Sequence, residues 1–147
     1  MADLKPILLV EDSTNDIELT LAALEENHLA NEVVVVRDGA EALDYLFERG
    51  VHAGRDARDL PAIVLLDLNL PKLDGREVLQ AIRGNEATHS LPVVVLTTST
   101  EPFDVEATYA LGVNSYIRKP VDFDQFVGVV KQIGLYWLVL NQPRVAG

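Results

Sequence analysis

Polar side chains that could bind a metal ion and transfer a phosphoryl group follow several short apolar runs of the sequence. Each lies where its run ends. In chain order they are Glu11, Asp12, Asp67, Thr97 and Lys119. Together they offer three carboxylates, a hydroxyl and an ammonium group. If the fold brings these run ends together, this set could hold a divalent cation and stabilise the charge of a phosphoryl group.

The three carboxylates set the first requirement of such a site, because like charges at close range repel one another. A hard divalent cation among them removes this difficulty, and Mg²⁺ takes oxygen ligands while keeping several waters. Asp12 and Asp67 suit direct ligation, whereas the longer Glu11 suits a contact through water. The backbone carbonyl of Asn69 could supply a further ligand.

A carboxylate that keeps one oxygen free beside the metal can act as a nucleophile and form an aspartyl phosphate. Lys119 and Thr97 would then stabilise the negative charge on the transferred group. The chemistry by itself leaves the nucleophile open among the three carboxylates. Asp67 is favoured because it follows the central apolar run, between those that carry Asp12 and Thr97.

Five apolar runs must position these residues. They are Ile7–Val10, Val33–Val36, Ile63–Leu66, Val93–Leu96 and Ser115–Ile117. Most are continuous and rich in β-branched residues, which is typical of strands buried on both faces of a parallel sheet. Helical spacing between the runs predicts right-handed crossovers and a doubly wound α/β fold. Ligands of such folds bind beyond the carboxyl ends of the strands, where the polar residues fall.

Several other acids have a structural interpretation. Capping signals, in which an acid precedes a Glu or Gln by three residues, predict helix starts at Asp38, Asp74 and Asp122. Asp12 could likewise cap a helix that begins near Thr14, since a single acid at a strand end is more often a cap than a ligand. The conjunction of all the run-end residues on one edge favours the site.

The remaining irregular features are interpreted as surface features. The stretch Arg49–Pro61 is longer than the usual connection of about 4–6 residues, and we expect a solvated loop, with a recognition surface as the alternative. His28, His52 and His89 are isolated, so we expect surface residues and no histidine phosphotransfer module.

Composition limits the classes of function. The 147 residues suffice for one domain, and the net charge of −11 argues against nucleic-acid binding, which needs a basic face. There is no cysteine, no secretory signal and no apolar stretch near the ~20 residues of a membrane span. We therefore expect a cytoplasmic protein without disulfides.

The run-end motifs resemble the bacterial response-regulator receiver family. The resemblance extends from about Lys5 to Gly134, in segments with all signature elements in order: Ile7–Asp12, Val64–Pro71, Asp74-Gly75, Pro92–Thr97 and Tyr116–Pro120. It implies a flavodoxin-like (CheY-like) α/β fold, with a five-stranded parallel sheet of order 2-1-3-4-5 and helices on both faces. We expect a receiver domain over residues 1–135 and a short tail over residues 136–147.

The resemblance also implies the role of each site residue. Asp67 is implied as the phosphoacceptor, and Glu11, Asp12 and the Asn69 carbonyl as the Mg²⁺ site. Lys119 is implied to contact the phosphate. Its peptide bond to Pro120 is expected to be cis. Thr97 and Tyr116 are implied as the switch residues. The resemblance implies no organic cofactor. Glu11 stands where many members have Asp, and Thr98 where many have Ala.

A narrower resemblance points to a partner. Phrases such as Val95–Ser99, Asn114–Tyr116, Lys119–Phe126 and Leu135–Trp137 are similar to stand-alone response regulators paired with bacterial phytochromes. This implies a bacteriophytochrome histidine kinase as phosphoryl donor, and output through the receiver's own surface. It also favours a homodimer through the apolar tail Leu135–Leu140, which could otherwise extend the last helix over its own core.

Two other classes share parts of this pattern. A metal-dependent phosphatase with an aspartate nucleophile needs a second acid two residues later to protonate the leaving group, and Asn69 cannot do so. A nucleotide or flavin binder needs a phosphate loop with free helix N–H groups, where Glu11 and Asp12 would repel an anion.

Overall fold

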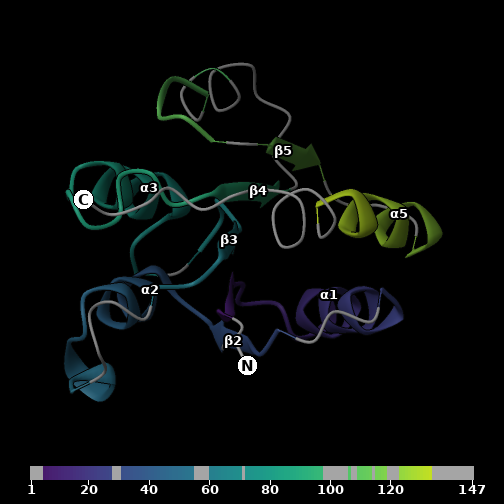
Figure 1. Cartoon of the computed structure of the whole chain (residues 1–147), viewed down its shortest axis with the longest axis horizontal. Coiled ribbons are helices and arrows are strands. Elements are labelled where there is room, and N and C mark those ends of the chain that lie inside the picture. The colour runs from purple at the N-terminus through teal and green to yellow at the C-terminus, as the bar shows by residue number, and fades with distance from the viewer. Residues whose placement is uncertain are drawn as a thin grey trace.

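The computed structural model describes residues 5–27, 31–54, 60–70, 72–97, 106, 109–113, 115–118 and 123–133 (Figure 1). In the described residues strands and helices alternate from β1 to β4, with one 3₁₀ turn, η1, after α2, and β5 and α5 follow. The elements are β1 (Ile7–Val10), α1 (Thr14–Glu26), β2 (Val33–Val36), α2 (Gly39–Leu46), η1 (Gly50–His52), β3 (Ile63–Leu66), α3 (Gly75–Arg83), β4 (Val93–Thr97), β5 (Ser115–Arg118) and α5 (Phe123–Ile133). Across these described ranges, no helix is both long and apolar enough to cross a membrane.

The strands form one parallel sheet in the order β2-β1-β3-β4-β5. Its register aligns the strand ends, because Val10 of β1 pairs with both Val36 of β2 and Leu66 of β3, and Leu66 pairs with Val95 of β4. The predicted α/β class and the parallel order 2-1-3-4 are confirmed. The fifth strand, β5, pairs with β4 through Val94 and Ser115 at the edge of the sheet.

Alternate residues of the central strands enter two separate cores. In β1, Leu8 and Val10 pack with α2 and α3, whereas Ile7 and Leu9 pack with α1 and α5. Figure 1 shows these two pairs of helices on opposite sides of the sheet. A strand covered on both faces must be apolar at every position, which explains why the runs are continuous and do not alternate.

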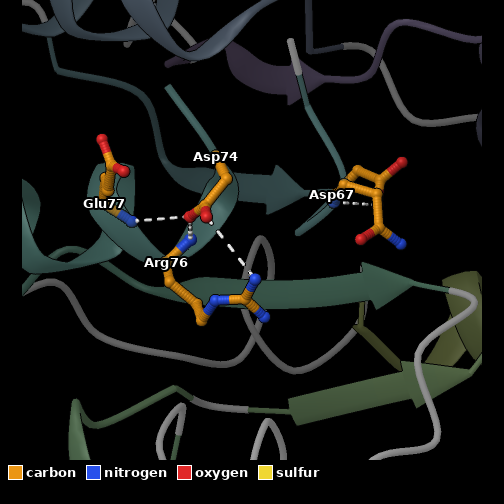
Figure 2. Close-up of polar contacts among 5 residues, drawn as sticks. Asp67, Asp74, Arg76 and Glu77 are labelled. Carbon is orange, nitrogen blue, oxygen red and sulfur yellow. Dashed lines mark hydrogen bonds and ion pairs between the residues drawn. The ribbon is translucent and has the colours of Figure 1, made fainter. Parts of the chain in front are cut away.

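Two of the predicted helix caps are confirmed, and both belong to helices that start at the carboxyl edge of the sheet. The Asp38 carboxylate accepts the Glu41 N–H at 2.8 Å and begins α2. The Asp74 carboxylate accepts the N–H groups of Arg76 at 2.8 Å and Glu77 at 3.1 Å (Figure 2). Asp122 lies outside the described residues. Asp38 and Asp74 therefore have structural roles.

The connection between α2 and β3 differs in part from the expected solvated loop. Residues 50–52 form η1, and His52 packs edge-on against Tyr45 of α2, with ring centroids 5.2 Å apart. The His52 Nε2 atom is buried and lies 3.5 Å from a Glu41 carboxylate oxygen. The prediction of a plain surface histidine is wrong at this position, because burial against an aromatic ring leaves no sequence pattern.

Arg83 lies at the edge of the sheet where β4 and β5 begin, opposite the carboxyl edge. Its guanidinium donates to the carbonyls of Leu111 and Leu91, at 2.7 and 2.8 Å, and to those of His89 and Gly112. Burial lowers the pKa of this arginine from its ordinary value, although the group stays protonated at neutral pH. Arg83 thus ties the end of α3 to the segments that lead into β4 and β5.

Gly75 allows α3 to begin directly against the end of β3. Its N–H donates to the Leu68 carbonyl at 2.9 Å. A Cβ atom at this position would overlap the Asp67 carbonyl oxygen and lie 2.5 Å from the Leu68 Cα. Because both neighbours are backbone atoms, no side-chain rotation relieves the overlap. The absence of a side chain at Gly75 therefore fixes the backbone that carries Asp67.

We predict that Gly75→Ala lowers the free energy of unfolding by about 1–3 kcal/mol, the usual cost of an added carbon in a packed region. Urea denaturation measures this change. The matched control is Gly128→Ala in α5, where an added Cβ meets nothing within 4 Å. Alanine is the better helix former, so the control should be neutral or stabilising by up to about 1 kcal/mol. Equal effects of the two substitutions would contradict the packing argument.

Candidate functional site

Three carboxylates gather at the carboxyl edge of the sheet. Glu11, Asp12 and Asp67 each offer a ligand oxygen, and these oxygens lie within 4.8 Å of one another. Glu11 and Asp67 are only 3% and 7% exposed, while Asp12 is exposed. The structure thus brings together the three acids that the sequence places at separate run ends.

The two buried acids are unusual among the buried polar side chains of the described residues. The others, Thr20 and Thr88, each donate a hydroxyl to a backbone carbonyl, at 2.8 and 2.7 Å, as ordinary core residues do. Carboxylates are seldom buried, because desolvation of a charge is costly unless partners compensate for it. The burial of Glu11 and Asp67 side by side therefore calls for compensating partners, and a bound cation is the strongest of these.

Main-chain hydrogen bonds place both buried acids. The Glu11 N–H donates to the Val36 carbonyl at 3.0 Å, and the Asp67 N–H donates to the Val10 carbonyl at 3.0 Å. The parallel ladder therefore continues one residue beyond each apolar run. As a result Glu11 and Asp67 lie on neighbouring strands at the same level of the sheet edge.

Backbone N–H groups offset part of the negative charge of the Glu11 and Asp67 carboxylates. The Glu11 carboxylate accepts the N–H groups of Asp12 at 3.1 Å and Ser13 at 3.3 Å. The Asp67 carboxylate accepts the Asn69 N–H at 3.0 Å, as the dashed line beside Asp67 shows in Figure 2. These bonds hold the side chains in place, and the oxygen-rich cluster fits a hard divalent cation.

Ser13, and not Asp12, caps α1. The Ser13 hydroxyl accepts the Asp16 N–H at 3.3 Å, and Ser13 has the extended backbone of a capping residue. The spacing Ser13-x-x-Asp16 is a sequence signal for this cap. The Asp12 side chain is consequently not used as a cap and belongs to the acidic cluster.

The remaining predicted site residues are described to different extents. Thr97 ends β4, where it pairs with Arg118 of β5. Tyr116 is half-buried in β5 and packs against the core that includes α2 and α3. Asn69 is exposed just past Asp67. Lys119 lies outside the described residues, as do Thr98 and Pro120.

The fold and the acidic edge together match a known family. Residues 7–131 match the response regulator receiver domain, and the chain belongs to this family. Among curated relatives, it is 45% identical over 136 residues to the probable methanogenesis regulatory protein FilR2 of Methanothrix harundinacea, covering 92% of this chain and 85% of FilR2. It is 42% identical over 134 residues to response regulator Rcp1 of a Synechocystis strain, covering 91% and 89% of the two chains.

Solved structures extend the comparison. The bacteriophytochrome response regulator RtBRR is 55% identical, with a TM-score of 0.80 over 97% of this chain and 85% of its own. The phosphorylated cyanobacterial phytochrome response regulator RcpA is 44% identical, with a TM-score of 0.86 over 95% and 98%. Rcp1 was solved with bound Mn²⁺, and its TM-score is 0.85 at 40% identity over 96% and 99%.

These findings define the class of activity. The chain is a receiver of phosphorelay signalling, and its family consists typically of signalling domains that are not enzymes. Receiver domains bind a divalent metal at an acidic pocket, and this structure has an acidic cluster at Glu11, Asp12 and Asp67. The phosphatase alternative is not favoured.

The assignment of the α1 cap generates a stability prediction. In EDTA, Ser13→Ala should lower the free energy of unfolding by about 1 kcal/mol, because it removes a capping hydroxyl. Asp12→Asn should not lower it, because Asp12 is exposed without a capping role and the loss of one of the three carboxylates relieves repulsion in the cluster. Urea denaturation of both variants checks this. A larger loss in Asp12→Asn than in Ser13→Ala would identify Asp12 as the cap after all.

Proposed function

We propose that this protein accepts a phosphoryl group from a sensor histidine kinase onto Asp67, with Mg²⁺ held at the acidic cluster. The observation that carries the proposal is the convergence of Glu11, Asp12 and Asp67, two of them buried, at one edge of the sheet. In this assignment Asp12, Asp67 and the Asn69 carbonyl are direct ligands, and Glu11 acts through water. Mg²⁺ would supply positive charge that offsets the carboxylates and the phosphoryl oxygens.

The cluster contains three acids, and their surroundings favour one as nucleophile. The Glu11 carboxylate already accepts two N–H groups of its own loop. Asp12 is exposed, and it lies at the side of the cluster nearest the start of α1. Asp67 follows β3, which lies between β1 and β4, so Glu11 follows the strand on one side and Thr97 ends the strand on the other. This central position supports Asp67.

The transfer itself balances without a redox partner. An Asp67 carboxylate oxygen forms a bond to phosphorus as the bond between phosphorus and the kinase histidine nitrogen breaks. The imidazole leaves with the bonding electron pair and takes a proton from water. Lys119 would contact the phosphoryl oxygens, and Thr97 and Tyr116 would change orientation in response. In this proposal the protein catalyses only its own phosphorylation and dephosphorylation.

The proposed donor is a bacteriophytochrome kinase, and the proposed site of action is the cytoplasm. The names of RtBRR and RcpA, which link those proteins to phytochromes, support the donor. The name of FilR2 points to a different pathway, so phosphotransfer from a purified phytochrome kinase is the deciding comparison. The proposed receiver domain spans residues 1–135 and contains the complete five-stranded sheet. It would pass the signal on through protein–protein contacts of its own surface.

Phosphorylation of Asp67 is tested by incubation with acetyl phosphate and Mg²⁺ followed by intact mass measurement. Wild type should gain one phosphoryl group, and Asp67→Asn should gain none. Asp44→Asn is the matched control, because Asp44 lies on α2 and pairs with Arg49 at 3.6 Å. It should be labelled as wild type is. Labelling of Asp67→Asn, or no labelling of wild type, would overturn the proposal.

The tail generates a separate prediction. We propose that residues 136–147 mediate a two-fold symmetric homodimer, because this apolar segment carries the only tryptophan of the sequence. The full chain should be a dimer in light scattering, and removal of residues 136–147 should give a monomer. A dimer that persists without the tail would place the interface elsewhere.

A further inference from the structure

Arg37 contacts the main chain of Asp12, one of the clustered acids, although the two residues follow different strands. It follows β2 directly, and its guanidinium Nη1 donates to the Asp12 carbonyl oxygen at 3.3 Å. Both terminal nitrogens also lie 3.3 Å from the Thr14 hydroxyl oxygen. One exposed arginine therefore spans from the end of β2 to the connection between β1 and α1.

The backbone of Arg37 is itself held. Its N–H donates to the Glu41 carboxylate at 3.3 Å, from the first turn of α2. In turn Asp38, the next residue, caps that helix. These hydrogen bonds hold the backbone from which the Arg37 side chain reaches Asp12.

Both peptide groups of Asp12 are consequently occupied. Its N–H donates to the Glu11 carboxylate at 3.1 Å, and its carbonyl accepts from Arg37. Asp12 is exposed and precedes the helix, so these two bonds limit rotation of the residue that carries a metal-ligating carboxylate. A ligand held in one orientation loses less conformational freedom when an ion binds.

By its charge alone, Arg37 would weaken the binding of a divalent cation, which is opposite to the effect of holding Asp12 in place. A guanidinium near the cluster repels a divalent cation, although solvent weakens that repulsion at an exposed site. When the Arg37 side chain is removed, the loss of positioning would therefore lower the affinity for the cation, whereas the loss of repulsion would raise it. This difference makes the role of Arg37 measurable.

We propose that Arg37 is a positioning residue for the divalent-cation site, which it serves by holding the Asp12 main chain; this inference rests on the proposed function of the cluster. Arg37 touches no phosphoryl group or metal in this role. It acts through Asp12, as partners of metal ligands commonly do.

The test is calorimetric titration of the full chain with Mn²⁺. Arg37→Ala should bind Mn²⁺ about tenfold more weakly than wild type, the lower end of the range for lost partners of metal ligands. Arg37→Lys keeps the charge but lacks the fork that reaches two acceptors, so it should also bind more weakly. The Mg²⁺ concentration for half-maximal labelling by acetyl phosphate should rise by the same factor as the loss of affinity.

The controls separate this inference from the proposal on which it rests. Thr14→Val removes the second acceptor of the guanidinium but leaves the Asp12 carbonyl, and it should weaken Mn²⁺ binding less than Arg37→Ala does. Asp12→Asn should greatly weaken binding if the cluster is the metal site; unchanged binding there would overturn the proposed site itself. Equal or tighter Mn²⁺ binding by Arg37→Ala, in a protein whose Asp12→Asn variant loses the ion, would overturn the role of Arg37 alone.

Discussion

Repulsion among the Glu11, Asp12 and Asp67 carboxylates is the constraint on which the rest of the site depends. Two of these acids are buried, and all three offer oxygens within 4.8 Å of one another. Such an arrangement is tolerable in a folded protein only where other groups compensate for the charge. The main-chain N–H groups of the β1–α1 connection and of Asn69 supply part of this compensation. A divalent cation suits the remainder.

The surrounding fold holds the acids against that repulsion from two directions. On one side the ladder continues through Glu11 and Asp67, so their backbones cannot separate without breaking sheet hydrogen bonds. On the other side α3 begins against Asp67 because Gly75 lacks a side chain. Stability and signalling therefore share residues here, and substitutions near the site are expected to affect both.

Two acids outside the cluster have structural roles that keep them apart from it. Asp38 and Asp74 lie near the same edge of the sheet, yet their carboxylates accept N–H groups at the starts of α2 and α3. Ser13 has the corresponding position on α1, which leaves Asp12 available to the cluster. The serine cap of α1 thus leaves Asp12 to the cluster, whereas Asp38 and Asp74 are structural acids.

The sequence by itself determined the α/β class, the bounds of β1, β2 and β3, those of β4 and β5 to within one residue, two of the caps and the identity of the clustered acids. It could do so because burial on both faces leaves continuous apolar runs, and because parallel strands end at one edge. Only the tertiary structure decided how His52 packs and that Arg37 reaches Asp12, 25 residues away in the sequence. These contacts join separate segments through single side chains, so no local periodicity or spacing encodes them.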